Sequence, residues 1–318
     1  MNSSALENRI ALYDGIRKSA SIETDDGVLL NFKLTRLEEQ SLRELVQKYI
    51  LAAAKAWNVS DEIDITNVNY LKDYKAQILN LPNRTPNGAV FPKKENIDEY
   101  NELHKLVNQI LVSHKIAPHI RGAANPVIRV QDGQDNRYND RHYATTKLHS
   151  DAWVGHTGDA ILSIMVDGDQ TTGLEFNIPE GQISPSIFSK IENFDIGLEF
   201  FEKLRHLGTA KFGHMYIFDH GCIHKTVKSG GGLRTSIEFG IVMNDSKGIA
   251  SSYNETDNLN DRDTYVIMNQ FLRLGNSIKI EAVESLQQTY EKFANEDYNK
   301  KPLGSIKTNI IFAEQGEK

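Results

Sequence analysis

The sequence predicts an α+β fold in which helical segments flank a central run of short β-strands. Before about residue 126 and after about residue 243, apolar residues recur at three- and four-residue steps, the period of an amphipathic helix. Between these positions the pattern changes to short alternating runs separated by turn-forming Gly, Asn and Asp. Because no linker or internal repeat interrupts the chain, we expect its 318 residues to form a single domain.

Residues 1–125 are predicted to be an N-terminal helical support. A short strand-like piece, Gly27–Phe32, precedes the first helix, which we expect over Thr35–Trp57 with its threonine as the cap. A second helix is expected to begin at Asn96, which together with Glu99 has the spacing of a capping box.

Residues 126–243 are predicted to form the β-strand core, with one helical insertion at about residues 187–207. The strand-like runs of this core are Val127–Gln131, Ala160–Val166, Leu174–Ile178, Met215–Phe218 and Arg234–Met243. Residues 244–318 are expected to be a C-terminal helical extension, with helices at Tyr265–Leu274 and Ala282–Phe293.

The composition narrows the class of protein. The formal net charge of -7 argues against a nucleic-acid partner, whose phosphates require a basic surface. The single cysteine, Cys222, cannot form an internal disulfide, and no apolar run approaches the length of a signal peptide core or a membrane span. We therefore expect a cytoplasmic protein that binds neither nucleic acid nor membrane; the oligomeric state stays open.

Two motifs in strand-like surroundings carry the chemistry. His149 and Asp151 form a His-x-Asp pair, which alone is a weak signal because about 1.4 such pairs are expected by chance. His224 is followed ten residues later by Arg234 and then by Ser236, a combination expected only about 0.1 times by chance. The two motifs together are much more specific than either alone.

The residue types explain why these motifs belong together. Two imidazoles and one carboxylate can occupy one face of a ferrous ion and leave the opposite positions open. In a strand, Arg234, Ser236 and Glu238 share one face, because successive side chains alternate. An arginine fork can bind a carboxylate with two parallel hydrogen bonds, and a serine hydroxyl can add a third.

These residues resemble the Fe(II)/2-oxoglutarate-dependent dioxygenase superfamily, and in particular the phytanoyl-CoA-hydroxylase-like small-molecule hydroxylases. The resemblance covers residues 126–243 and implies a double-stranded β-helix core, also described as jelly-roll or cupin-like. It places Fe(II) on His149, Asp151 and His224, and the cosubstrate 2-oxoglutarate on Arg234 and Ser236.

The resemblance also implies an activity, in which 2-oxoglutarate and O2 are converted to succinate and CO2 while an unactivated C–H bond of a small molecule is hydroxylated. A sugar, an amino acid or a biosynthetic intermediate is the expected substrate, and another oxidation, such as desaturation or ring closure, stays open. Halogenating relatives lack the carboxylate that Asp151 keeps, and nucleic-acid demethylases carry an arginine where this chain has Gly240. One alternative is a cupin-like, non-oxidative metal-dependent isomerase or sugar-binding protein. Another is that the motifs are fortuitous and the chain is a scaffold.

Other polar residues are weaker candidates. His220 is a competing metal ligand close to His224, although the ten-residue step to the arginine favours the latter. Near the first motif, the residues expected to line the cavity and contact substrate are Trp153, His156, Arg129 and Gln131. A loop containing Tyr138, Arg141 and His142 is expected to fold over the substrate.

Overall fold

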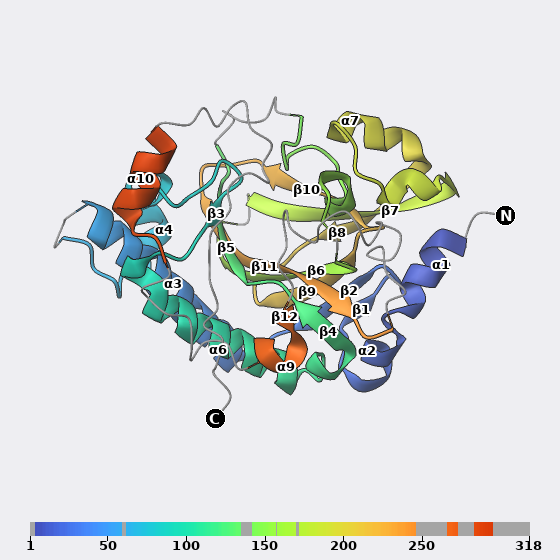
Figure 1. Cartoon of the computed structure of the whole chain (residues 1–318), viewed down its shortest axis with the longest axis horizontal. Helices are drawn as coiled ribbons and strands as arrows, with labels where there is room; N and C mark the ends of the chain where they lie inside the picture. The colour runs from blue at the N-terminus through green and yellow to red at the C-terminus, as the bar shows by residue number, and fades with distance from the viewer. Residues whose placement is uncertain are drawn as a thin grey trace.

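Strand β11 (Leu233–Met243) lies in the middle of a large antiparallel sheet, around which the other elements are arranged (Figure 1). This computed structural model describes residues 4–58, 62–134, 142–156, 158–169, 172–245, 266–272 and 283–294. One edge of β11 pairs with β6, and its other edge pairs first with β5 and then with β4. Together with the order β1-β2-β9-β6-β11-β4-β12, this pairing makes a nine-stranded sheet.

The strands of the large sheet come from both halves of the chain. Besides β11 they are β1 (Thr24–Asp25), β2 (Leu29–Lys33), β3 (Ala89–Val90), β4 (Ile120–Ala123), β5 (Val127–Asp132), β6 (Ala160–Gly168), β9 (His214–Asp219) and β12 (Val266–Ile267). A smaller antiparallel sheet has the order β10-β7-β8 and consists of β7 (Thr172–Ile183), β8 (Phe201–Thr209) and β10 (Ile223–Lys228).

The small sheet packs against one face of the large sheet. Ile161 and Met165 on β6 share a buried apolar cluster with Phe176 on β7 and Ile223 on β10. Leu162 and Ile164, which alternate with them along β6, belong to the other apolar cluster, on the opposite face. This two-residue alternation divides the core into an inter-sheet layer and a helix-covered layer.

Helices α3 (Arg36–Asn58) and α6 (Ile97–Ser113) cover the outer face of the large sheet (Figure 1). The other described α-helices are α1 (Ser4–Ala11), α2 (Asp14–Ser19), α4 (Tyr70–Asp73), α5 (Lys75–Leu79), α7 (Phe194–Gly197), α9 (Met268–Phe271) and α10 (Leu286–Ala294). Short 3-10 helices are η1 (Lys94–Asn96), η2 (Ala117–His119), η3 (Asp151–Val154), η4 (Pro185–Phe188) and η5 (Leu198–Phe200).

The structure confirms the predicted mixture of helices and antiparallel strands. The helix expected over Thr35–Trp57 is α3, and a capping box begins it: Thr35 N–H donates to Glu38 Oε2 (2.8 Å) and Glu38 N–H donates to Thr35 Oγ1 (3.2 Å). All five predicted core strands are present, as β5, β6, β7, β9 and β11.

Three local predictions are wrong. The helix expected over residues 187–207 is replaced by short helical turns and strand β8, because the segment pairs with β7. Asn96 occupies the N-cap position of α6 as expected, but the predicted capping box is absent: its side chain accepts from Lys93 N–H and donates to Tyr49 O. Within Tyr265–Leu274, the described residues form β12 and α9 rather than one continuous helix. The helix expected at Ala282–Phe293 corresponds to α10.

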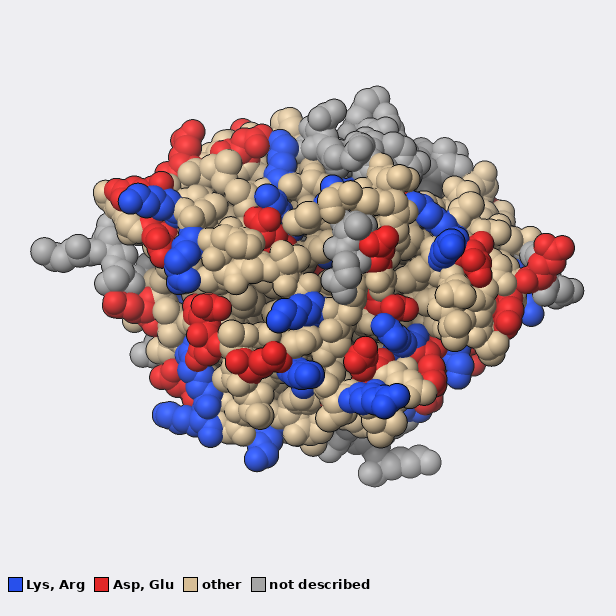
Figure 2. All heavy atoms as spheres, turned by 180° about the vertical axis from the view of Figure 1, so that it is seen from behind, with Lys and Arg blue, Asp and Glu red and all other residues tan. Residues whose placement is uncertain are grey.

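Among the described helices, none combines the length and the apolar character that a membrane-spanning segment requires. On the face seen from behind, basic and acidic side chains are interspersed (Figure 2). That face therefore carries mixed charge rather than one sign.

A buried ion network ties the N-terminus to the strands that frame the site. Arg9 of α1 pairs with Asp159, just before β6, and with Asp219, at the end of β9, at 3.2 and 2.8 Å. Tyr13 Oη also donates to Asp219 (2.6 Å), whose other oxygen accepts from Gly221 N–H (2.7 Å). The network thus fixes the turn that leads from β9 into β10.

We expect Arg9→Met to lower the free energy of unfolding by about 3 kcal/mol, because it leaves two buried carboxylates without their cation. Equilibrium urea unfolding measures the change. Arg205→Met is the matched control: Arg205 pairs with Glu180 at 2.7 Å, but both side chains are about half exposed, so its loss should cost less than about 1 kcal/mol. Equal losses in the two variants would contradict the role of the network.

Candidate active site

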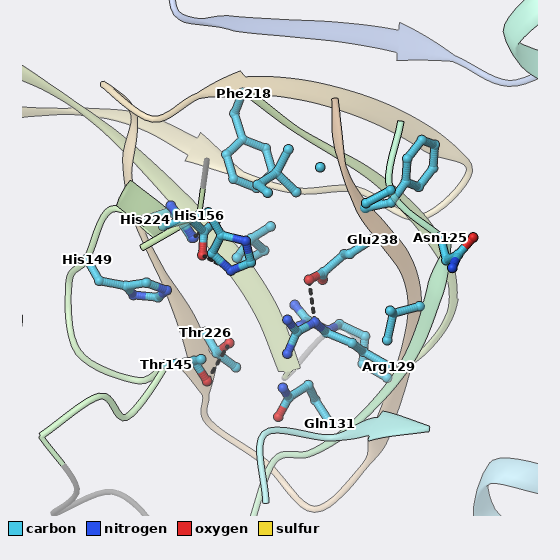
Figure 3. A pocket seen from close by; sticks show the side chains of 18 residues that line it. Asn125, Arg129, Gln131, Thr145, His149, His156, Phe218, His224, Thr226 and Glu238 are labelled. Atoms are coloured by element: carbon cyan, nitrogen blue, oxygen red, sulfur yellow. Dashed lines mark hydrogen bonds and ion pairs between the residues drawn. The ribbon is translucent and has the colours of Figure 1, made fainter. Parts of the chain in front are cut away.

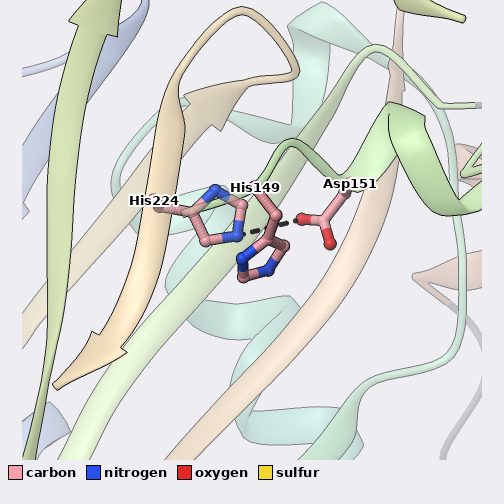
Figure 4. A group of neighbouring side chains, drawn as sticks. All are labelled: His149, Asp151 and His224. Atoms are coloured by element: carbon pink, nitrogen blue, oxygen red, sulfur yellow. Dashed lines mark ion pairs between the residues drawn. The ribbon is translucent and has the colours of Figure 1, made fainter. Parts of the chain in front are cut away.

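His149, Asp151 and His224 lie together although they are far apart in the chain (Figure 4). One nitrogen or oxygen atom from each of the three side chains lies within 4.8 Å of the others, and His224 Nε2 is 3.5 Å from Asp151 Oδ2. The backbone brings the histidines together, because the N–H of each donates to the carbonyl of the other at 2.9 Å. Residues paired in this way across an antiparallel ladder present adjacent side chains.

Asp151 is placed by the turn that follows His149. It is the first residue of η3, and Ser150 caps that turn by accepting from Ala152 N–H at 3.2 Å. Ser150 Oγ also donates to His220 O (2.6 Å), which ties the turn to the segment just before β10. The third side chain is therefore held against the histidine pair from two directions.

Hydrogen bonds fix which nitrogen of each histidine faces the group. His149 Nδ1 lies 2.8 Å from Lys147 O, and His224 Nδ1 lies 3.2 Å from Cys222 O. A carbonyl only accepts, so each Nδ1 carries the proton and each Nε2 presents its lone pair. Phe194 of α7 stacks on the His149 ring at 4.5 Å and further restricts its orientation.

The electrostatics of the three groups match metal binding. Burial lowers the pKa of His149 to about 3, with a further contribution from His224. Burial alone would raise the pKa of Asp151, but the neighbouring His224, His156 and His149 outweigh this effect and lower it. A neutral imidazole at His149 beside an ionised Asp151 carboxylate matches the protonation states that a divalent cation needs. This donor set fits the facial arrangement of non-haem iron.

Arg234 lines the same cavity as the triad. It lies on β11 opposite Gln131 of β5 and Gly168 of β6, and only 1% of its surface is exposed. A Cβ at Gly168 would lie 2.6 Å from Arg234 Cα, so only glycine leaves room for the arginine backbone. Burial lowers the pKa of Arg234 to about 10, which leaves it a cation at neutral pH.

The Arg234 guanidinium lacks full internal pairing. Its Nε and Nη1 atoms are buried and have no hydrogen-bond partner among the described residues. Unpaired buried donors of a charged group are costly, and an anionic ligand in the cavity would satisfy them. The arginine therefore fits the binding of a carboxylate.

Ser236 and Glu238 follow Arg234 on the same face of β11. Ser236 Oγ donates to Glu238 Oε1 at 2.9 Å, and Glu238 Oε2 forms an ion pair with Arg129 Nε at 2.5 Å (Figure 3). Glu238 and Arg129 line the cavity, whereas Ser236 is fully buried and lies behind the lining. Glu238 was not among the residues to which the sequence assigned a role, although strand alternation placed it on this face.

The structure places most of the other candidate residues around the cavity. Figure 3 shows His156 on the side of the two histidines and Arg129 with Gln131 on the opposite side. Gln131 Nε2 and Arg129 Nη1 both donate to Asn87 O. The cavity lining that the sequence did not single out includes Thr145, Thr226, Phe218, Leu174 and Asn125.

Trp153 and His220 lie elsewhere. The expectation that Trp153 lines the mouth of the cavity is corrected: its ring is fully buried against Phe194 and Phe200, and its Nε1 donates to Ile187 O at 2.8 Å. His220 is buried outside the group of three ligands, and burial lowers its pKa to about 4. Tyr138 and Arg141 lie outside the described residues.

Comparisons with known proteins gave matches among solved structures alone. No family model matches the sequence, and a search of the curated proteins found no match. Among solved structures, the chain is similar to the non-heme α-ketoglutarate-dependent carbocyclase SnoK from nogalamycin biosynthesis, with TM-score 0.41 and 9% identity over 74% of this chain and 83% of that chain.

A second similar structure is the non-heme α-ketoglutarate-dependent epimerase SnoN, with TM-score 0.35 and 12% identity over 75% of this chain and 83% of that chain. SnoN in complex with Fe3+, α-ketoglutarate and nogalamycin RO gives TM-score 0.35 and 11% identity over 75% of this chain and 84% of that chain. These neighbours are non-heme iron enzymes, but likeness at TM-scores this low carries no argument for this chain. The case for a function rests on the residues of the site.

We expect acid to destabilise the metal-free protein through His220. Its pKa is about 4 in the folded state and about 6.5 when unfolded, so the unfolded chain binds more protons between these values. The stability that neutral, buried His220 contributes is complete above pH 6.5 and declines as the pH falls towards 4. Between pH 7.5 and pH 5, His220→Asn should lose about 2 kcal/mol less unfolding free energy than wild type.

Urea unfolding of EDTA-treated protein at the two pH values measures this difference. His206→Asn, which removes an exposed histidine on β8, is the control and should keep the wild-type pH dependence. An unchanged pH dependence in His220→Asn would contradict the assignment.

Proposed function

We propose that this protein is an Fe(II)- and 2-oxoglutarate-dependent oxygenase that hydroxylates an unactivated C–H bond of a small molecule. One observation supports the proposal most strongly: the group of His149, Asp151 and His224 faces the same cavity as the buried, incompletely paired guanidinium of Arg234. A metal site and an anion site in one cavity are what a dicarboxylate cosubstrate that also binds iron requires.

The strand connections support a double-stranded β-helix, the finer form of the predicted fold. From β6 in the large sheet the chain crosses to β7 and β8 in the small sheet and returns to β9. It then crosses again to β10 and returns to β11. This exchange between two facing antiparallel sheets, with the site between them, is the arrangement of cupin-like jelly rolls.

Each residue has a role that follows from its surroundings. His149 and His224 would hold the metal through Nε2, and Asp151 would be its anionic ligand. The three ligands together would leave the opposite face of the ion open to other ligands. Arg234 would bind the distal carboxylate of 2-oxoglutarate and so orient it along the cavity. When bound, Fe(II) and 2-oxoglutarate supply with O2 the oxidising chemistry, and succinate and CO2 are released.

The rest of the cavity would receive the substrate. Phe218, Leu174 and Ile161 form an apolar side that excludes water, whereas Gln131 and Asn125 offer amide groups. We propose a small polar molecule, such as a sugar, an amino acid or a biosynthetic intermediate, as the substrate. His156, close to Asp151 at 3.9 Å, is placed to contact it.

Replacing His149 or Asp151 with Ala should abolish Fe(II) binding and 2-oxoglutarate turnover, because each change removes one of three protein ligands. Metal content after anaerobic loading and succinate formation under O2 measure the two effects. His206→Ala is the control and should retain both. Full metal binding in either ligand variant would contradict the assignment of the triad.

Arg234→Ala should weaken 2-oxoglutarate binding about 100-fold, because it removes the charge-assisted hydrogen bonds to the distal carboxylate. Anaerobic titration of the Fe(II)-loaded protein with 2-oxoglutarate measures this through the visible metal-to-ligand band. Arg205→Ala, at an exposed arginine on β8, is the control. A band that forms with equal affinity in wild type and Arg234→Ala would show that this arginine does not bind the cosubstrate.

Wild-type protein should form succinate only when O2 is present. A protein that binds the metal but forms no succinate under O2 would instead support the alternative of a cupin-like isomerase or sugar-binding protein. Analysis of the oxidised product would then distinguish hydroxylation from desaturation or ring closure.

A further inference from the structure

Glu238 contacts two polar side chains that neighbour Arg234 in the sheet, those of Ser236 and Arg129. Ser236 stands between Arg234 and Glu238 on the inward face of β11, and Arg129 lies opposite Ser236 on β5. The Glu238 side chain turns back along the strand, so that one oxygen accepts from Ser236 Oγ at 2.9 Å and the other pairs with Arg129 Nε at 2.5 Å. Its carboxylate therefore points towards the anion site.

This arrangement conflicts with simultaneous binding of another carboxylate at Ser236. A serine hydroxyl has one proton, and here it is donated to Glu238. A dicarboxylate that binds Arg234 can gain the Ser236 hydrogen bond only if Glu238 gives it up. The two carboxylates would also repel each other in a cavity whose walls are largely buried, where charges are weakly screened.

The charges of the residues around Ser236 also support a conflict between Glu238 and a bound dicarboxylate. Arg129 and Glu238 form an ion pair in which the two charges offset each other. Arg234 has two buried donors, Nε and Nη1, without a hydrogen-bond partner among the described residues. If Glu238 served only to neutralise Arg129, its second oxygen would have no need of Ser236. The contact with Ser236 connects this pair to the residue expected to bind the cosubstrate.

We propose that Glu238 is an internal carboxylate that competes with the bound dicarboxylate for Ser236 and thereby sets its affinity. The inference rests on the proposed function, because it identifies the dicarboxylate with 2-oxoglutarate and its product succinate. Before the ligand binds, Ser236 Oγ donates its hydrogen bond to Glu238. When the ligand binds, Ser236 Oγ donates to the ligand's distal carboxylate instead. A weaker hold on that carboxylate also favours release of succinate, which carries the same group.

Glu238→Gln tests the proposal because it keeps the size of the side chain and removes its charge. We expect it to bind 2-oxoglutarate and succinate about tenfold more tightly than wild type, because like-charge repulsion is removed and Ser236 is more readily released. Anaerobic titration of the Fe(II)-loaded protein measures the first affinity, and calorimetry measures that of succinate. Glu180→Gln, which breaks the exposed pair with Arg205, is the matched control and should not change either affinity.

Ser236→Ala separates competition from a general change of charge. In the wild-type background, Ser236→Ala should weaken 2-oxoglutarate binding by no more than about threefold. The variant loses the Ser236 hydrogen bond to the ligand, but the free protein also lacks the Ser236–Glu238 hydrogen bond that would have to break on binding, so the two losses largely cancel. In the Glu238→Gln background the same change should cost about tenfold. Equal costs in the two backgrounds would overturn the competition.

A second pair of variants covers the case in which Glu238→Gln alone folds poorly. Arg129→Gln and Arg129→Gln/Glu238→Gln differ only at Glu238, and the double variant leaves neither partner of the ion pair unpaired. The double variant should bind both ligands more tightly than Arg129→Gln. Thermal melting and near-ultraviolet circular dichroism establish that the compared proteins are folded.

The outcomes distinguish the proposed function from the competition at Ser236. Wild-type protein that binds neither ligand would overturn the proposed function and this inference together. Wild-type binding that is unchanged or weaker in Glu238→Gln, and in the pair built on Arg129→Gln, would overturn this inference alone and leave Glu238 as a structural partner of Arg129.

Discussion

The two backbone hydrogen bonds between His149 and His224 are the interaction on which the site depends. They place the two imidazoles next to each other through the main chain rather than through side-chain contacts, at a ring-centroid distance of 4.3 Å. Asp151 then needs only the short turn of η3, which Ser150 caps and ties to the segment before β10. Side chains that are placed by a paired backbone in this way are held in position before any ligand arrives.

Strand β11 supplies the other half of the site. One of its faces carries polar residues of the site, and the other carries apolar residues of the core. Ile237, Phe239 and Ile241 pack into the helix-covered cluster, whereas Arg234, Ser236 and Glu238 occupy the opposite face. Because the period of a strand is two, a slip by one residue would turn the arginine into the helix layer. Pairing on both edges, with β6 and with β5 and β4, holds the register.

Sequence patterns predicted the parts of the structure that depend on local periodicity. The core strands and the first long helix follow from it, and the spacing of the motifs indicated which histidines and which arginine belong together. Strand β8 did not follow, because Phe201, Leu204 and Leu207 recur at three-residue steps that favour a helix, and pairing with β7 overrides this preference. Trp153 was misplaced for a similar reason: the space for its ring is left by Gly197, distant in sequence.

The charges of the cavity could not be predicted from either strand alone. Alternation placed Glu238 on the face of Arg234, but its contact with Arg129 depends on the register of β5 against β11. The same register buries the Arg234 guanidinium with donors unpaired among the described residues, which costs stability in the folded protein. Any anion that pairs with this arginine recovers part of that cost, so folding and ligand binding are linked through one side chain. Because Glu238 competes for the hydroxyl of Ser236, only part of the free energy recovered at Arg234 appears as affinity for the ligand.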